Sequence, residues 1–393
     1  RGRKMDRESF LKTGAYFLGL VRLGSEENRK KSLFPKKPDG VKWTDIFYLS
    51  EKHSLSAVTF RALESADEKP KGEVWEKWER AYRVCVHADI QQLFAWDEIK
   101  EDFSEKGINV LPLKGLRIKK LYPETVLRLM GDLDILYRKS QFFEVKNGLQ
   151  ALGYIYKKES AGGHHQIFER PPVTHVEMHR ALLPDESPFA EYYADPWQRA
   201  LPTDEESVYR FSLEDEYIFM LMHGYKHFSG AGSGVRTVLD FYLFLKAYGD
   251  TLNREYIDGE IAAADALAEK RGAEGAPLKN FEATLFREIG LWFEGESAVL
   301  DETGLEILSD GVYGRAEKRW IKESRKKGRG KYLFGRLFPP FRTMKQAFPV
   351  LKKLPFLLPF FWIWRILRGV FKRRKNIARE VRCVNGEFRK EEK

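Results

Sequence analysis

Two aspartates, one residue apart, interrupt an apolar run at residues 130–136, and this pattern constrains the fold more than any other part of the chain. A β-strand directs alternate side chains to one face, so Asp132 and Asp134 are predicted to project together while their apolar neighbours anchor the strand. Two like charges this close repel each other unless a cation lies between them. Their oxygens suit Mg²⁺, which usually takes one or two protein carboxylates. The pattern alone also fits a solvated strand edge.

A lysine and a glycine follow the apolar segment at residues 108–113, which is predicted to form a strand. Lysine binds phosphate as a point charge, so Lys114 is a candidate for holding a triphosphate, and Gly115 allows close approach of the backbone. The alternative for Lys114 is a solvated surface lysine. Arg128, just upstream of the aspartates, is predicted either to clamp phosphate or to pin the loop that leads to them.

Residues 174–179 alternate with a period of two, which predicts a strand with His175, Glu177 and His179 on one face. Glu177 is predicted to complete a carboxylate site with the aspartate pair. Zinc on this strand face is an alternative, although the arrangement is not the helical His-Glu-x-x-His and no cysteine assists. His179 is otherwise predicted to support the carboxylates or to contact the substrate.

These motifs together resemble the uncharacterised nucleotidyltransferase family, which belongs to the DNA polymerase beta-like superfamily. The resemblance extends over roughly residues 45 to 370. In the position of the wider superfamily's Gly-Ser pair the chain has Lys114-Gly115. The resemblance therefore does not determine how the triphosphate is held or which nucleotide is the donor. The motifs are Leu113-Lys114-Gly115, Arg128-x-Met130-Gly131-Asp132-x-Asp134, Val176-Glu177-Met178-His179, His223-x-x-Lys226-His227 and Arg236-x-x-x-Asp240.

The resemblance implies a fold class and an activity. The fold is α+β, with a small mixed sheet in a nucleotidyltransferase-like core and helical regions on both sides. The activity is transfer of a nucleoside monophosphate from an NTP such as ATP, with Mg²⁺ or alternatively Mn²⁺ and release of pyrophosphate. Asp132 and Asp134 would bridge two metal ions, and Glu177 would bind the catalytic one. The acceptor, a sugar, a small molecule, RNA or a protein side chain, stays open.

Histidines are concentrated in one part of the chain, with six of the eight between residues 164 and 227. His164 and His165 are predicted to lie in a loop that borders the pocket. His223 and His227, four residues apart on one helix face, are predicted to close the nucleotide pocket together with Lys226. The alternative is a set of core histidines with satisfied hydrogen bonds.

The region from about 205 to 310 is predicted to be helical, with one helix from Ser212 to about His227 and another over Val235–Tyr248. Arg236 and Asp240 lie four residues apart on the second helix. They are predicted either to contact the substrate or to pair with each other on the helix surface.

Hydrophobic periodicity predicts four parts: a helical region at 1–103, the catalytic core at 104–204, a helical domain at 205–330 and a basic aromatic tail at 331–393. Trp43–Leu63 is predicted as one helical stretch of the first part. Within the core, strands are predicted at Ile108–Leu113, Asp132–Tyr137, Tyr154–Tyr156, Gln166–Phe168 and Thr174–His179, and a helix at Gln141–Leu152.

Charge is distributed unevenly along the chain. The formal net charge is +10, yet residues 315–393 contain 25 Lys and Arg against 6 Asp and Glu, so the excess of positive charge belongs to the tail. Such a tail predicts an anionic partner. Residues 354–371 are rich in aromatic side chains and are followed by the basic run 372–375, which together suit a membrane interface. The alternatives are packing on the main body and a solvated charged end.

Two cysteines far apart, Cys85 and Cys383, predict neither a disulfide framework nor a zinc site and fit a reducing cytoplasm. The predicted location is cytoplasmic, with peripheral attachment at the inner membrane face as an extension. The rival to an enzyme is a non-catalytic protein of the same fold that binds a membrane surface or nucleic acid.

Overall fold

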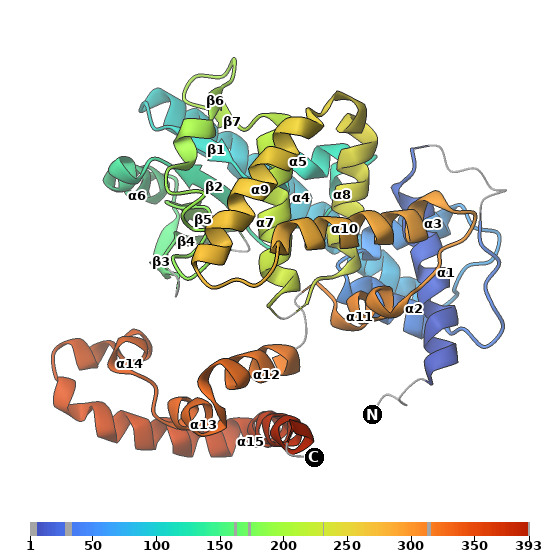
Figure 1. The fold of residues 1–393 in the computed structure, drawn as a ribbon. Helices are drawn as coiled ribbons and strands as arrows, with labels where there is room; N and C mark the ends of the chain where they lie inside the picture. The colour runs from blue at the N-terminus through green and yellow to red at the C-terminus, as the bar shows by residue number, and fades with distance from the viewer. Residues whose placement is uncertain are drawn as a thin grey trace. The chain divides into compact units, whose positions relative to one another are not determined.

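The computed structural model of the chain describes residues 6–27, 34–160, 163–171, 174–230, 232–312 and 316–391. These residues group into two compact units (Figure 1). The first contains the described parts of 1–226 and 233–312, and the second those of 227–232 and 313–393.

A five-stranded sheet forms the centre of the first unit. Its strands are β1 (Val110–Pro112), β2 (Leu133–Tyr137), β3 (Ile155–Glu159), β4 (His165–Arg170) and β5 (Thr174–His179). They lie in the order β1-β2-β5-β4-β3. Strands β2 and β5 run parallel, and the other neighbouring pairs are antiparallel. The mixed sheet and the α+β class agree with the sequence prediction.

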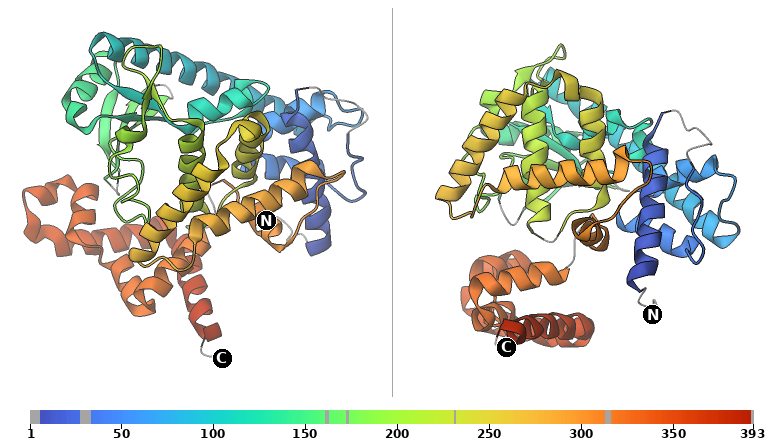
Figure 2. Two further views of the ribbon diagram at one scale, coloured as in Figure 1. Left: turned by 45° about the horizontal axis from the view of Figure 1, so that its top comes forward. Right: turned by 45° about the vertical axis from the view of Figure 1, so that its right-hand side comes forward.

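One face of this sheet lines a hydrophobic core of the first unit. Ile135 and Val176 lie on it and are fully buried against α4 (Glu73–Glu105) and α6 (Phe142–Ala151), which contribute Phe103 and Val145 among others. Figure 2 shows the long helix α4 running beside the strands. Because alternate residues of a strand face opposite ways, the residues between these apolar ones project from the other face.

The N-terminal helices are α1 (Arg7–Ser25), α2 (Trp43–Lys52) and α3 (Ser56–Glu64), followed by α4. The single helical stretch predicted at Trp43–Leu63 is therefore two helices. The chain breaks at Ser54, whose φ of 54° lies in the left-handed region and cannot continue a right-handed helix. Periodicity of apolar residues does not detect such a break, because both helices bury the same kind of face.

The second half of the first unit is helical, as predicted. Its helices are α7 (Leu213–Phe228), α8 (Val235–Tyr248), α9 (Arg254–Lys270), α10 (Pro277–Ile289) and α11 (Glu302–Asp310). The first turn of α7 is capped by the Ser212 hydroxyl, which accepts a hydrogen bond from the Asp215 amide at 3.0 Å. The short helix α5 (Lys114–Ile118) follows β1, and β6 (Leu201–Pro202) pairs with β7 (Tyr209–Arg210).

The second unit is built on the helix α15 (Leu358–Glu391), on which α12 (Ala316–Lys327), α13 (Arg329–Leu337) and α14 (Phe341–Ala347) pack. Glu380 of α15 is buried and accepts hydrogen bonds from Tyr332 and from both sides of the Arg336 guanidinium. The side chains of the basic run 372–375 lie outside the described residues. Within the described chain, no helix has both the length and the apolar character to cross a membrane.

The four-part division predicted from the sequence stays a prediction. The division into compact units places a boundary after residue 312. The predicted N-terminal region, core and helical domain together make up most of the first unit. These three parts share one contiguous body because α4 packs beneath the sheet.

Candidate active site

The parallel pairing of β2 with β5 determines which polar side chains meet. Asp134 lies opposite Glu177, and Leu136 lies opposite His179. In the antiparallel pairing of β5 with β4, His165 lies opposite His179. Paired residues of neighbouring strands project from the same face, so these polar side chains gather on the face opposite the core. The alternation predicted at residues 174–179 is confirmed.

Asp134, Glu177 and His179 can each bring a ligand atom to within 4.8 Å of the other two. Nε2 of His179 lies 2.9 Å from Oδ1 of Asp134 and 3.7 Å from Oε2 of Glu177. Asp132, the residue just before β2, interacts electrostatically with Asp134 and Glu177. The parallel strands thus bring the carboxylates of Asp134 and Glu177 together, and the Asp132 carboxylate interacts with both through its charge.

Asp132 and Asp134 ionise very differently. Burial, followed by the charges of Asp134 and Glu177, raises the pKa of Asp132 to about 7. Burial also opposes ionisation of Asp134, but a hydrogen bond from His179 and the charges of His179 and Lys114 outweigh it and lower the pKa of Asp134. The arrangement therefore keeps Asp134 ionised, whereas the charge of Asp132 is not compensated by a nearby cation to the same extent.

Two lysines supply positive charge on this face of the sheet. The amide of Leu113 donates to the carbonyl of Asp134 at 3.0 Å, and Lys114 follows at once as the first residue of α5. Burial lowers the pKa of Lys114 to about 8, with Asp134 opposing that shift. Lys226 of α7 also has a pKa lowered by burial, which the charges of Asp134 and Glu177 oppose. Both predicted lysines therefore lie within electrostatic reach of the carboxylates.

A buried ion pair anchors the loop that precedes the aspartates. Nε and Nη2 of Arg128 each donate to the Asp240 carboxylate at 2.8 Å, and the Tyr122 hydroxyl donates to the same carboxylate at 2.8 Å. Arg236 donates to the carbonyl of Leu129 at 2.7 Å. The bonds from Nε and Nη2 of Arg128 to Asp240 agree with the predicted role of pinning the loop, while its predicted contact with phosphate stays a prediction. Asp240 of α8 therefore pairs with a residue of the loop before β2, and the charge of Arg236 also acts on it.

Gly115 allows the chain to pass close to this loop. A Cβ at that position would lie 2.6 Å from Sδ of Met130, which is closer than real contacts allow. The glycine thus lets α5 begin directly against the residues before Asp132, and its predicted place in the nucleotide site stays a prediction.

The remaining histidines separate into two groups. His164 and His165 lie beside His179, with ring centroids 4.4 Å apart between the first two and 4.8 Å apart between His165 and His179. His175 is half exposed and pairs with Glu169 at 3.4 Å. Groups of described residues able to gather three ligand atoms include Glu177 and His179 but not His175, which does not support a zinc site made of His175, Glu177 and His179. The sequence predicted both His164 and His165 in a loop, but His165 is the first residue of β4, because it pairs with His179 across the hairpin.

His223 and His227 both lie on α7, where His223 packs edge-on against Phe219 and His227 is exposed. Their predicted part in closing a nucleotide pocket with Lys226 stays a prediction. The helix does bring Lys226 to the carboxylates.

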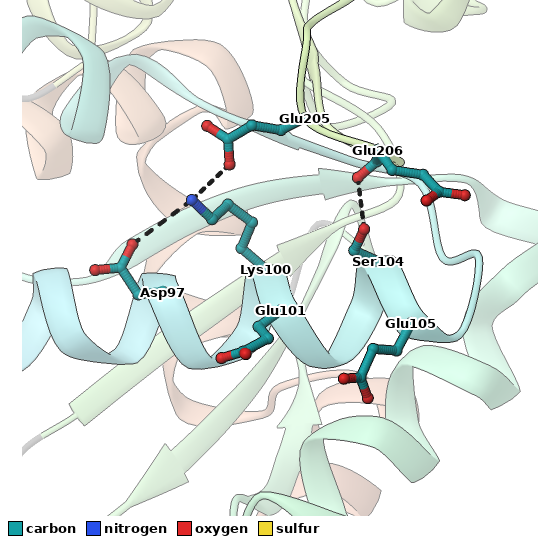
Figure 3. Close-up of a pocket in the computed structure, with 7 residues that line it drawn as sticks. All are labelled: Asp97, Lys100, Glu101, Ser104, Glu105, Glu205 and Glu206. Carbon is teal, nitrogen blue, oxygen red and sulfur yellow. Dashed lines mark hydrogen bonds and ion pairs between the residues drawn. The ribbon is translucent and has the colours of Figure 1, made fainter.

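A surface cavity of about 440 Å³ lies away from the carboxylate–histidine group, between α4 and the loop at Glu205 and Glu206 (Figure 3). Lys100 bonds to Glu205 and also lies 3.8 Å from Asp97. Five carboxylates line the cavity against this one lysine, so it repels an anionic ligand such as a nucleotide. Its lining residues are Asp97, Lys100, Glu101, Ser104, Glu105, Glu205 and Glu206.

A small mixed sheet with acidic residues meeting on two parallel strands, next to partly buried lysines, has the features of the nucleotidyltransferase class. The chain belongs to the uncharacterised nucleotidyltransferase family, whose model matches residues 39–269, more than half of its length. The match includes every predicted site residue. It ends well before residue 370, to which the sequence motifs suggested that the resemblance extends.

Two solved structures are similar to part of the chain. The crystal structure of ANT(2″)-Ia in complex with adenylyl-2″-tobramycin aligns with a TM-score of 0.34 and 16% identity, covering 45% of this chain and 98% of that one. The solution structure of the antibiotic-resistance factor ANT(2″)-Ia aligns with a TM-score of 0.26 and 17% identity, covering 51% and 92%. No curated protein matches the sequence.

Proposed function

We propose that this protein transfers a nucleoside monophosphate from an NTP to an acceptor hydroxyl and releases pyrophosphate, with ATP as the first donor to test. The observation that carries the proposal is the meeting of Asp134 and Glu177 on parallel strands in a chain of the nucleotidyltransferase family. The acceptor is a sugar, a small molecule, RNA or a protein side chain, and the experiment below distinguishes these.

The donor atoms fit a hard divalent cation. Asp132, Asp134 and Glu177 offer carboxylate oxygens, the ligands that Mg²⁺ and Mn²⁺ prefer. Burial and then the like charges of Asp134 and Glu177 raise the pKa of Asp132, and a cation would compensate those like charges. We propose that Asp132 and Asp134 hold two such ions and that Glu177 holds one of them. When bound, the ions would neutralise the triphosphate and make the acceptor hydroxyl more acidic.

The lysines are proposed to hold the phosphates. Lys114 has a pKa of about 8, so it remains largely protonated at neutral pH and presents a positive charge beside Asp134. Lys226 approaches the same carboxylates from α7. The Arg128–Asp240 pair is proposed to act indirectly, because it holds the loop that positions Asp132.

The test is transfer of label from each α-labelled NTP to components of a cell lysate, with Mg²⁺ or Mn²⁺. We expect wild-type protein to label one class of acceptor and the Asp132→Asn/Asp134→Asn variant to label none. Asp204→Asn is the matched control, because Asp204 is an exposed aspartate outside the site. Equal labelling by wild type and a folded double variant would overturn the proposal and favour a non-catalytic protein of this fold.

A second proposed property concerns the second unit. We propose that it docks on an anionic lipid surface from the cytoplasmic side, where two free cysteines, Cys85 and Cys383, would stay reduced. Phe356, Phe360 and Trp364 are 73%, 59% and 51% exposed. Large exposed apolar side chains in a segment of strongly positive charge are typical of interfacial binding.

Co-sedimentation with vesicles tests this docking. We expect binding to vesicles that contain phosphatidylglycerol and much less to pure phosphatidylcholine, with a decrease at high salt. Phe356→Ser/Phe360→Ser should weaken binding, while Phe143→Ser, which removes an equally exposed phenylalanine of α6 in the first unit, should not. Unchanged sedimentation of the double variant would contradict the proposal, and competition by RNA alone would favour a nucleic-acid partner.

A further inference from the structure

We propose that His164, His165 and His179 form a binding site for a transition-metal ion of the Zn²⁺ type. The site is built from nitrogen ligands and is distinct from the oxygen ligands proposed above for Mg²⁺. Each of the three rings can bring a nitrogen to within 4.8 Å of the other two. The inference goes beyond nucleotidyl transfer, since that reaction does not require a nitrogen site.

The hairpin of β4 and β5 brings the three rings together. His165 and His179 are cross-strand partners, and His164 is the residue just before β4. The carbonyl of His164 accepts hydrogen bonds from the amides of Arg180 and Ala181 at 3.0 and 3.2 Å. The backbone on both sides of the rings is therefore held in place, as a preorganised metal site requires.

The second nitrogen of two rings is already held by a carboxylate. Nε2 of His165 lies 3.0 Å from Oε2 of Glu177, and Nε2 of His179 lies 2.9 Å from Oδ1 of Asp134. Histidines that bind metal usually donate their other ring N–H to a carboxylate, which orients the ring and increases its basicity. Both histidines have this arrangement, with Nδ1 as the nitrogen left for a ligand.

Those two Nδ1 atoms are buried and have no hydrogen-bond partner among the described residues. An unsatisfied buried polar atom costs about 1–3 kcal/mol, so two such atoms on the cross-strand partners His165 and His179 need an explanation. A metal ion bound to both would satisfy them. His164, which is 9% exposed, supplies the third imidazole, with Nδ1 3.5 Å from the Ser160 hydroxyl and Nε2 available as the ligand.

The ligand type selects the ion. Imidazole suits Zn²⁺ and the other late first-row ions, whereas Mg²⁺ requires oxygen. Three protein ligands leave a fourth position for water or substrate, as catalytic zinc sites do. The negative charges of Asp134 and Glu177 behind the rings offset the positive charge of the ion and of nearby Lys226.

The experiment is metal binding by the full-length, tag-free chain after treatment with a chelator. Titration with ZnCl₂ alone, followed by calorimetry and elemental analysis, should give one Zn²⁺ per chain, and X-ray absorption should show a first shell of nitrogen. MgCl₂ at the same concentration should not displace it. His164→Ala should weaken Zn²⁺ binding at least tenfold.

The control is His175→Ala, which removes an exposed histidine of β5, the strand that contains His179, and should leave Zn²⁺ affinity unchanged. A second variant, His164→Asn, keeps a polar side chain if alanine disturbs the hairpin, and circular dichroism verifies the fold of each. The proposal is overturned if the folded wild type shows no saturable Zn²⁺ binding, or if both His164 variants bind as tightly as wild type. Asp132→Asn should keep its Zn²⁺ while losing nucleotidyl transfer, which separates this proposal from the proposed function.

Discussion

The two faces of one strand, β5, differ completely in chemistry. Val176 and Met178 point into the core and are fully buried among aliphatic and aromatic side chains. Glu177 and His179 alternate with them and face Asp134, His165 and the lysines. Burial of the apolar face can therefore stabilise the sheet strongly enough for the other face to hold mutually repelling groups close together. Substitutions on each face should therefore change different properties.

Removing one carboxylate of the polar face should have the largest effect. Asp134→Asn keeps the shape and the hydrogen bond to His179 but removes the charge. We expect nucleotidyl transfer to fall by about 10³-fold or more, because metal ligation contributes several kcal/mol to the transition state. The melting temperature should fall less than activity does, because the lost attraction to His179 and Lys114 is partly offset by the lost repulsion from Asp132. Measurements of transfer rate and melting temperature on the same samples test this; retained activity would break the comparison between the faces.

Breaking the buried ion pair beside the site should mainly lower stability. Asp240→Asn leaves the Arg128 guanidinium buried without its counter-ion, which costs about 3–5 kcal/mol. Chemical denaturation measures the loss.

The same pair predicts a pH dependence. Burial alone would raise the pKa of Asp240, but Arg128 outweighs it and holds the pKa below the ordinary 3.8. A carboxyl whose folded pKa is lowered contributes stability that is fully present above its unfolded value and is lost as the pH falls through the folded value. The wild type should thus lose this contribution below about pH 4, while Asp240→Asn lacks it at every pH. Parallel acid denaturation curves for the two proteins would contradict the assignment.

A change on the apolar face should affect stability alone. Met178→Ala removes a fully buried side chain and should lower the free energy of unfolding by about 2–5 kcal/mol. Transfer per folded molecule should remain close to wild type at a temperature where the variant is folded. Val84→Ala, on an exposed position of α4, is the control and should change stability by less than about 0.5 kcal/mol. A large loss of activity without a loss of stability would show that the two faces are coupled.

The smallest effect is expected at Lys114. Lys114→Ala should raise KM for the NTP and lower kcat/KM by about 10–100-fold, the value of one hydrogen bond to a charged group. Because the pKa of Lys114 is about 8, kcat/KM of the wild type should decline as the pH rises through that value and the lysine loses its charge. Lys114→Arg should move this decline to higher pH. A pH profile that is the same in all three proteins would exclude Lys114 from phosphate binding.

Local patterns predicted much of the sheet and of the site. Alternation at residues 174–179 and the apolar run around the aspartates predicted β5 and β2 almost to the residue, because a half-buried strand must alternate. The residue types at Asp134, Glu177 and Lys114 predicted carboxylates beside a lysine, and their catalytic roles stay predictions. The break at Ser54 was not predictable, since a single backbone angle decided it.

By itself the sequence determined the periodicities, the excess of positive charge after residue 314 and the carboxylates that resemble those of a nucleotidyltransferase. Only the tertiary structure decided that Arg128 pairs with Asp240, 112 residues away, and that His165 and His179 meet across a hairpin. Such contacts depend on strand register and on how helices pack against the sheet. Both are determined by burial summed over the whole fold, which no local stretch of sequence contains.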